Sequence, residues 1–303
     1  MPMTKFDITF ATYAQLPDGD PDDLLALDIL KNRGYMVRTA IWNDCSVDWS
    51  ESGLCVLRST WDYHLHYADF ISWVERVAAQ TKLFNPIELI RWNSNKKSYM
   101  QDLANQGAPV IETVWAEKDS VVDLRQLLKR RGWGKAVIKP GVGCGTFNVK
   151  RVSNEPASLA AGQTHLDSLL HVGDAMVQPY LTAVETYGER ALVFIDGQYS
   201  HATFKPAFQA LLPTGQAGEQ PTKATHEEIE VAAQILTLAP EKPLYARVDL
   251  VPNNEGQISL LELELVEPSL FLSMDPDLAP PLFADAIERL IAKPSLQSQC
   301  KVD

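Results

Sequence analysis

Apolar and polar positions along the N-terminal part of the chain follow two different periods. Apolar runs at residues 5–13, 35–43 and 54–60 have the length and composition of β-strands. Residues 21–33 and 68–80 instead carry apolar side chains at helical spacing. Because strands that alternate with helices form parallel sheets covered on both faces, we predict an N-terminal α/β domain.

The pattern changes near residues 85–86, and residues 91–97 lead into the next helix, so we place the first domain boundary at the end of this region. We predict three domains, over residues 1–95, 96–185 and 186–303, with an α+β arrangement in the C-terminal part. Further helices are expected at residues 98–106, 121–131, 227–238 and 283–291, and further strands at 110–116, 176–181, 190–195 and 198–205.

Residues 245–269 form the stretch around which we expect the chain to be organised. They read YARVDLVPNNEGQISLLELELVEPS. Two β-rich segments, 245–251 and 257–267, flank the turn-forming sequence Pro-Asn-Asn-Glu-Gly. The stretch therefore predicts a β-hairpin.

Three acidic residues lie in this hairpin. Glu262 and Glu264 are two residues apart, and a turn centred near residues 254–255 pairs Asp249 with Leu260, so all three carboxylates share one face. Converging carboxylates repel one another and need a cation, and oxygen ligands favour Mg²⁺ or Mn²⁺. The alternative interpretation is the solvated side of an ordinary two-faced strand.

A predicted strand at residues 135–140 delivers Lys139 to a glycine-rich loop. Gly141, Gly143 and Gly145 follow it within a few residues. Glycines let backbone N–H groups approach an anion closely, and the lysine adds a positive charge, so the segment favours phosphate binding. The spacing is not that of a Walker loop, and a flexible turn is the alternative.

Polar and aromatic residues follow the third predicted strand. Because ligands bind at the carboxyl ends of strands in open α/β sheets, we expect Arg58 to hold a substrate carboxylate, with Trp61 and Tyr63 beside it. An ordinary salt bridge is the alternative for Arg58. His64 and His66 are interpreted as polar surface rather than as metal ligands.

Composition narrows the class of protein. The chain has 303 residues, 46% of them hydrophobic and 22% charged, with a formal net charge of −12, which argues against a nucleic-acid groove. It shows no bilayer-length apolar run and no secretory signal, and its four cysteines lack metal-ligand spacing, so we expect a cytoplasmic protein without a membrane partner. No GxGxxG follows the first predicted strand, which disfavours an oxidoreductase with a dinucleotide fold.

The order of the weak motifs is more specific than any one of them. A lysine after an Asn-rich turn, Val-Ile-Lys-Pro with glycines, Gln-Pro-Tyr-Leu, Gly-Glu, Arg-x-Asp and Glu-x-Glu occur in sequence. From Arg91 onwards the chain resembles the ATP-grasp superfamily. It is most similar to the glutathione-synthetase-like branch and, within it, to the D-cycloserine-forming ligases, on the segments 57–63 (LRSTWDY) and 261–272 (LELELVEPSLFL). The resemblance implies a pre-ATP-grasp domain followed by a two-lobed ATP-grasp fold.

The resemblance also assigns roles to individual residues, with Lys96 as a rival of Lys97 because the acid that usually precedes this lysine is here another lysine. Asp249, Glu262 and Glu264 would bind two Mg²⁺ ions, although an asparagine usually fills the position of Glu264. The nucleotide residues would be Lys97 and Lys139 for the phosphates, Gln178, Pro179, Tyr180 and Leu181 for adenine, and Glu189 or Glu185 for the ribose.

The implied activity is that of an ATP-dependent, ADP-forming carboxylate–amine ligase that acts through an acyl phosphate on a small amino-acid-like acid. Arg247 and Lys205 would neutralise developing charge, and Arg58 would select the substrate. Cyclisation within one substrate and the joining of two amino acids or peptides both remain open. Relatives are commonly dimers or tetramers, so a homo-oligomer is expected. The rival interpretation is a catalytically silent nucleotide-binding scaffold.

Overall fold

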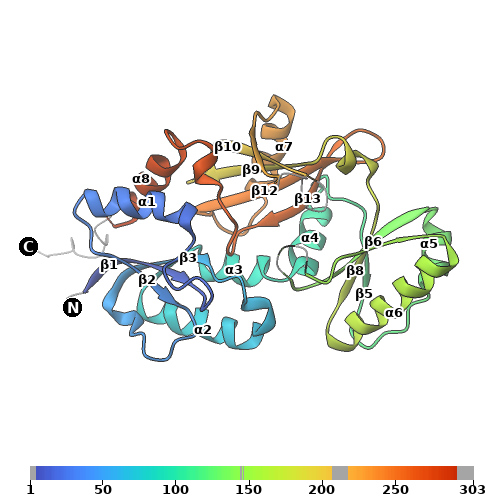
Figure 1. Cartoon of the computed structure of the whole chain (residues 1–303), viewed down its shortest axis with the longest axis horizontal. Helices are drawn as coiled ribbons and strands as arrows, with labels where there is room; N and C mark the ends of the chain where they lie inside the picture. Colours follow the sequence, from blue (N-terminus) through green and yellow to red (C-terminus); the bar gives the residue numbers. More distant parts are fainter. Residues whose placement is uncertain (1–4, 144, 146, 207–217, 292–303) are drawn as a thin grey trace, which may run out of the picture.

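The structure is a computed structural model, and it describes residues 5–143, 145, 147–206 and 218–291. Three β-sheets form its framework (Figure 1). Each sheet takes its strands from one stretch of the chain, and the first and third lie together at one end of the molecule while the second forms a separate lobe. The mixed α/β architecture predicted from the sequence is confirmed, whereas the domain boundaries remain a prediction.

The first sheet is parallel, as predicted, and its strand order is β2-β1-β3-β4. Helix α1 covers one of its faces and helix α2 the other (Figure 1). The elements of this part are β1 (Phe6–Thr12), α1 (Pro21–Asn32), β2 (Val37–Ile41), η1 (Trp49–Glu51), β3 (Ser52–Ser59), η2 (Tyr63–Leu65), α2 (Tyr67–Gln80) and β4 (Lys82–Phe84).

Two helices, α3 (Ile87–Asn93) and α4 (Lys96–Asn105), lead into the second sheet. This sheet is antiparallel, with the order β5-β8-β6-β7, and its helices α5 and α6 pack against it. Its elements are β5 (Val114–Ala116), α5 (Leu124–Arg131), β6 (Lys135–Pro140), β7 (Lys150–Ser153), α6 (Pro156–Val172) and β8 (Ala175–Pro179).

Helix α6 was not predicted from the sequence, although its signals are present. Pro156 occupies the first turn, where its missing N–H costs nothing, and Leu159, Leu166, Leu169 and Leu170 are buried at helical spacing. The many small and polar residues between these leucines dilute the apolar periodicity. The helix therefore depends on packing against the sheet more than on its local pattern.

The third sheet is antiparallel and has the order β11-β10-β9-β12-β13. Helix α7 packs against one of its faces, and α8 packs against the other, beside α1 (Figure 1). Its elements are η3 (Thr182–Glu185), β9 (Glu189–Ile195), β10 (Gln198–Lys205), β11 (Gln220–Thr222), α7 (His226–Thr237), β12 (Tyr245–Pro252), β13 (Ile258–Glu264), η5 (Leu272–Met274) and α8 (Ala279–Ile291).

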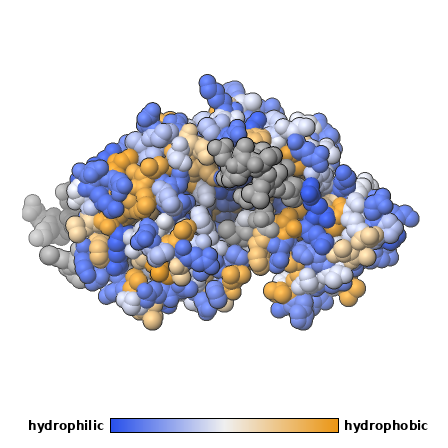
Figure 2. Space-filling view, viewed as in Figure 1, coloured by the Kyte–Doolittle hydropathy of each residue, from blue (hydrophilic) through white to orange (hydrophobic). Residues whose placement is uncertain are grey.

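One buried cluster joins the first and third sheets. Phe283 of α8 is fully buried in it, with its ring 6.1 Å from that of Phe10 on β1 and 6.0 Å from that of Tyr245 on β12. The second sheet has a cluster of its own. The two ends of the chain therefore share a core and form one body. At the lower edge of Figure 2 a notch separates this body from the second lobe, and hydrophilic residues there surround smaller hydrophobic groups.

No helix in the described residues combines the length and the apolar character needed to cross a membrane.

We predict that Phe283→Ala destabilises the protein strongly, because it opens a cavity in the core that joins the two ends of the chain. The expected loss of unfolding free energy is about 3–5 kcal/mol, as for other buried phenylalanines. Urea unfolding followed by circular dichroism measures this loss. Leu278→Ala is the control, since Leu278 is half-exposed just before the same helix. Equal midpoints for the two variants would contradict the shared core.

Candidate active site

The β12–β13 hairpin forms as predicted, but its register differs from the prediction. Asp249 pairs with Glu262 and not with Leu260, and Arg247 pairs with Glu264. Nearer the turn, Leu250 pairs with Leu260. One residue of β13, Leu261, is therefore an extra residue between the two regions, as in a β-bulge.

The bulge decides which way the acids point. Continuing the pairing of Leu250 with Leu260 without a bulge would place Leu261 opposite Asp249 and turn Glu262 to the other face. The extra residue restores the match, so Asp249, Glu262 and Glu264 lie on one face. The predicted shared face is therefore found, but for a different reason than the assumed turn geometry.

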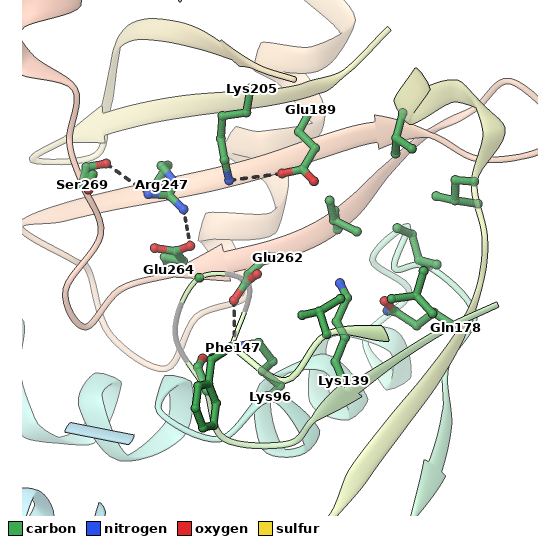
Figure 3. Close-up of a pocket in the computed structure, with 18 of the residues that line it drawn as sticks. Lys96, Lys139, Phe147, Gln178, Glu189, Lys205, Arg247, Glu262, Glu264 and Ser269 are labelled. Atoms are coloured by element: carbon green, nitrogen blue, oxygen red, sulfur yellow. Dashed lines mark hydrogen bonds and ion pairs between the residues drawn. The ribbon is translucent and has the colours of Figure 1, made fainter. Parts of the chain in front are cut away.

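A cavity of about 420 Å³ lies between the second and third sheets. Figure 3 shows Lys139 and Gln178 entering it from the second sheet, and Lys205, Glu189 and Arg247 from the third. The residues predicted from the sequence that line it are Lys139, Gly143, Gly145, Gln178, Pro179, Tyr180, Leu181, Glu189, Lys205, Arg247, Glu262 and Glu264.

Lys139 differs from the other basic side chains of the cavity in its contacts. It forms no ion pair with any residue that the structure describes, and Figure 3 shows its ammonium group projecting into the cavity. Burial lowers its pKa, with the carboxylates of Glu262 and Glu189 opposing the shift. A desolvated lysine without a close counter-ion is suited to an anionic ligand.

The acids on the hairpin are already compensated by bases. Glu262 forms an ion pair with Lys96 at 2.8 Å, and Glu264 forms one with Arg247. Burial would lower the pKa of Lys96, but the Glu262 carboxylate outweighs it and the pKa is raised. For Glu264, burial raises the pKa to about 7 against the opposing charge of Arg247.

Asp249 lies beneath the cavity and does not line it. Its side chain is 1% exposed, and its oxygens lie 2.9 Å from Arg247 Nε and 2.7 Å from Lys205 Nζ. Burial raises the pKa of Asp249, but these two cations outweigh it and bring the pKa to about 2. In the described residues, no three His, Cys, Asp or Glu side chains are arranged so that they could hold a metal ion.

The expected position of Lys97 was wrong, and its rival Lys96 lines the cavity instead. Lys97 Nζ points away, to Asp174 at 3.0 Å and Glu117 at 3.2 Å. The two lysines begin α4, capped by the side chain of Asn95. Neighbouring residues of a helix point in directions about 100° apart, so only one of them faces the cavity.

Arg58 was wrongly expected to face the substrate. It is 2% exposed and does not line the cavity, because its Nε binds Asp23 at 2.9 Å and its Nη2 donates to the carbonyl of Pro268 at 2.7 Å. The guanidinium also lies 4.7 Å above the ring of Tyr245. Trp61 does line the cavity, whereas Tyr63 borders a second cavity of only about 20 Å³.

Besides Lys97, two residues of the predicted nucleotide site do not line the cavity and have local contacts instead. Glu185 accepts a hydrogen bond from the Tyr180 hydroxyl at 2.7 Å. Gly141 donates its N–H to the carbonyl of Asp174 at 2.8 Å, and a Cβ at this position would lie 3.1 Å from that oxygen. Gly141 thus permits a close backbone approach.

The prediction missed two asparagines that fix the hairpin. Asn85 bonds through its side chain to the backbone of Leu244, Tyr245 and Leu265, and Asn93 bonds to that of Leu263 and Leu265. Their partners lie more than 150 residues away, so no local pattern announces them. Glu267, Ser269 and Phe271 also line the cavity, although only the sequence similarity drew attention to their segment.

Comparisons with known proteins agree with this geometry. The family model described as the N-terminal domain of D-cycloserine synthetase DcsG matches residues 8–85. The cycloserine biosynthesis protein DcsG of Streptomyces lavendulae is 36% identical over 83% of this chain and 88% of that protein. The crystal structure of D-cycloserine synthetase DcsG has a TM-score of 0.82 and 33% identity, covering 93% of this chain and 99% of that one.

A more distant likeness extends to an ATP-grasp ligase in complex with a nucleotide. PsnB, complexed with a minimal precursor, Mg and ADP, has a TM-score of 0.62 at 15% identity, covering 94% of this chain and 98% of that one. At this identity the likeness shows the fold alone. The similarity to DcsG over most of both chains shows more: this chain belongs to the DcsG family and is an ATP-grasp ligase that forms a carbon–nitrogen bond.

Proposed function

We propose that the enzyme activates the carboxyl group of a small amino-acid-like substrate with ATP and closes a ring by attack of an amine of the same molecule, as in D-cycloserine formation. The observation that carries this proposal is the cavity between the second and third sheets, where four basic side chains meet Glu262 and Glu264. The relationship to DcsG favours cyclisation over the joining of two molecules.

The nucleotide would lie between the two sheets. Lys139 from β6 and Lys96 from α4 would contact its phosphates, and the adenine would lie against residues 178–181. Glu189, which also lines the cavity, is suited to the ribose hydroxyls, because a carboxylate accepts hydrogen bonds from them. Lys205 now holds Glu189 at 3.1 Å.

Glu262 and Glu264 fit a magnesium ion as donors. Both are carboxylates that line the cavity from the same face of one strand, and carboxylate oxygen is what Mg²⁺ prefers. Asp249 fits less well, because its oxygens are bound by Arg247 and Lys205. A bound Mg²⁺ would neutralise charge on the phosphate oxygens.

The reaction begins when a carboxylate oxygen of the substrate attacks the γ-phosphorus of ATP and the bond to the β-phosphate oxygen breaks, which releases ADP. The amine then attacks the acyl carbon, forms the C–N bond, expels phosphate and loses a proton. Arg247 and Lys205 line the cavity and would stabilise the negative charge that develops there, and burial would strengthen their effect. Exclusion of water from the cavity during the reaction would protect the acyl phosphate from hydrolysis.

The proposed activity is tested by screening O-ureido amino acids and pairs of amino acids for stimulated ADP release, with the product masses measured. We expect an O-ureido amino acid to stimulate ADP release and to yield a product lighter than its substrate by at least the mass of water, because intramolecular amide formation removes the elements of water from one substrate molecule. A mass equal to the sum of two substrates less water would indicate intermolecular ligation. Nucleotide binding without ADP release for every candidate would favour a scaffold.

We predict that Lys96→Met weakens nucleotide binding, whereas Lys97→Met does not. Only Lys96 lines the cavity, and loss of a hydrogen bond to a charged group costs about 1.5–3 kcal/mol, or roughly 10- to 150-fold in Kd. Calorimetric titration with ADP and Mg²⁺ measures the effect. Lys97→Met serves as the matched control, being the next residue on the same helix. Equal losses in the two variants would contradict the assignment.

We also predict that Glu262→Gln abolishes turnover while the protein keeps its thermal unfolding midpoint within a few degrees. The amide is nearly isosteric but removes one negative charge, which Mg²⁺ coordination requires. ADP release at saturating Mg²⁺ gives the activity, and circular dichroism gives the midpoint. Glu255→Gln, in the exposed turn of the same hairpin, is expected to retain full activity. An active Glu262→Gln variant would remove the metal assignment.

A further inference from the structure

The two sequence segments that suggested the family, 57–63 and 261–272, contact each other in the structure. Arg58 donates to the carbonyl of Pro268, and Trp61 Nε1 donates to that of Glu267 at 3.1 Å. We propose that Arg58 and Trp61 are positioning residues, which hold segment 266–270 so that its side chains enter the substrate end of the cavity. This inference rests on the proposed function, because it concerns the same site.

Five consecutive carbonyls of this segment accept hydrogen bonds from side chains. The donors belong to strands of the first and third sheets and to the loop after β3. They are Tyr245 for Val266 (2.9 Å), Trp61 for Glu267 (3.1 Å), Arg58 for Pro268 (2.7 Å), Arg247 for Ser269 (3.2 Å) and His201 for Leu270 (2.9 Å). A segment outside regular secondary structure is thereby fixed at each peptide, as a strand in a sheet would be.

The orientation of this segment matters because of what it presents. The side chains of Glu267, Ser269 and Phe271 line the cavity, whereas Leu270 between them is fully buried in the core. Displacement of this segment would move the three cavity-lining residues relative to the cavity. The carbonyl of Ser269 also binds Arg247, so a displaced segment would move a residue proposed to stabilise developing charge.

The N-terminal domain holds the far end of the segment as well. The carboxylate of Asp22, in the first turn of α1, accepts the N–H groups of Leu272 and Ser273 at 2.6 and 2.8 Å. Asp23, the next residue, fixes Arg58. Residues 266–271, which we call the substrate wall, are thus attached to the N-terminal domain, whereas the proposed phosphate and adenine contacts come from the second sheet and α4.

Burying an arginine that contacts no ligand lowers the stability of the fold unless an opposite charge and hydrogen bonds compensate its guanidinium. Arg58 meets this condition in part, since its guanidinium connects Asp23 to the Pro268 carbonyl and lies over the ring of Tyr245, while its Nη1 has no hydrogen-bond partner among the described residues. In this position Arg58 would act on the cavity through segment 266–270, without contacting the substrate. Trp61 differs from Arg58 because it both donates a hydrogen bond to this segment and lines the cavity.

The test uses Trp61→Phe, which removes the indole N–H and keeps an aromatic ring. Loss of one hydrogen bond predicts a KM for an O-ureido amino acid that rises roughly 3- to 10-fold, with kcat within about two-fold. The Kd for AMPPNP is expected to be unchanged, because the nucleotide contacts lie on other elements. Amide hydrogen exchange of residues 266–271 in the free enzyme is expected to rise several-fold.

Trp73→Phe is the matched control, since Trp73 is buried in the same domain and its indole nitrogen has no hydrogen-bond partner among the described residues. It should leave the KM and the exchange of residues 266–271 unchanged. Arg58→Lys is a second variant, which keeps the charge beside Asp23 but loses the second donor of the fork. We expect it to reproduce the pattern of Trp61→Phe.

If the amide hydrogen exchange rates of residues 266–271 in both variants equal those of the wild-type enzyme, the inference is overturned, whatever the substrate. Raised exchange with an unchanged KM overturns it too, as does a fall in kcat alone, which indicates only loss of folded enzyme. The proposed function fails separately, if the wild-type enzyme releases no ADP with any candidate substrate.

Discussion

The site depends on the compensation of buried charge. Carboxylates without partners in a desolvated cavity would cost several kcal/mol each, so Lys96, Lys205 and Arg247 are as necessary to the hairpin as its strands. The compensation is unequal: Asp249 has two cations, while burial, together with nearby like charges, raises the pKa of Glu264 to about 7. This imbalance leaves room for a further cation at the surface of the cavity and little at Asp249.

The β-bulge at Leu261 brings the acids and their compensating bases together on one face of the hairpin. Pairing in the hairpin is set from the turn, and each residue added to one strand reverses the faces beyond it. Because the bulge lies between the turn and the acids, the turn-proximal leucines stay in the core while Glu262 and Glu264 meet Asp249 on the same side. One inserted residue therefore reconciles a hydrophobic core with a charged face.

Local pattern in the sequence sufficed for the elements whose periodicity is strong, such as β1, α1, α2 and the hairpin. It also indicated Lys139 and the acids, because their residue types carry the chemistry. It failed where the outcome depends on distant partners. Which of Lys96 and Lys97 faces the cavity depends on where helix α4 begins and on the ion pair between Lys97 and Asp174. Arg58 is held in the interior by hydrogen bonds to Asp23 and to a carbonyl 210 residues away. No spacing rule contains such contacts.

The distribution of these contacts also separates the two proposed ligand sites. The proposed phosphate and adenine contacts belong to the second sheet and α4, and this sheet has its own core. The substrate wall is tied to the N-terminal sheet by Arg58, Trp61 and Asp22, within the body that shares the Phe283 core. Arg247 belongs to that body too and reaches the wall through Ser269. Relative movement of the two parts would therefore change the distance between nucleotide and substrate without disturbing the groups that hold each of them.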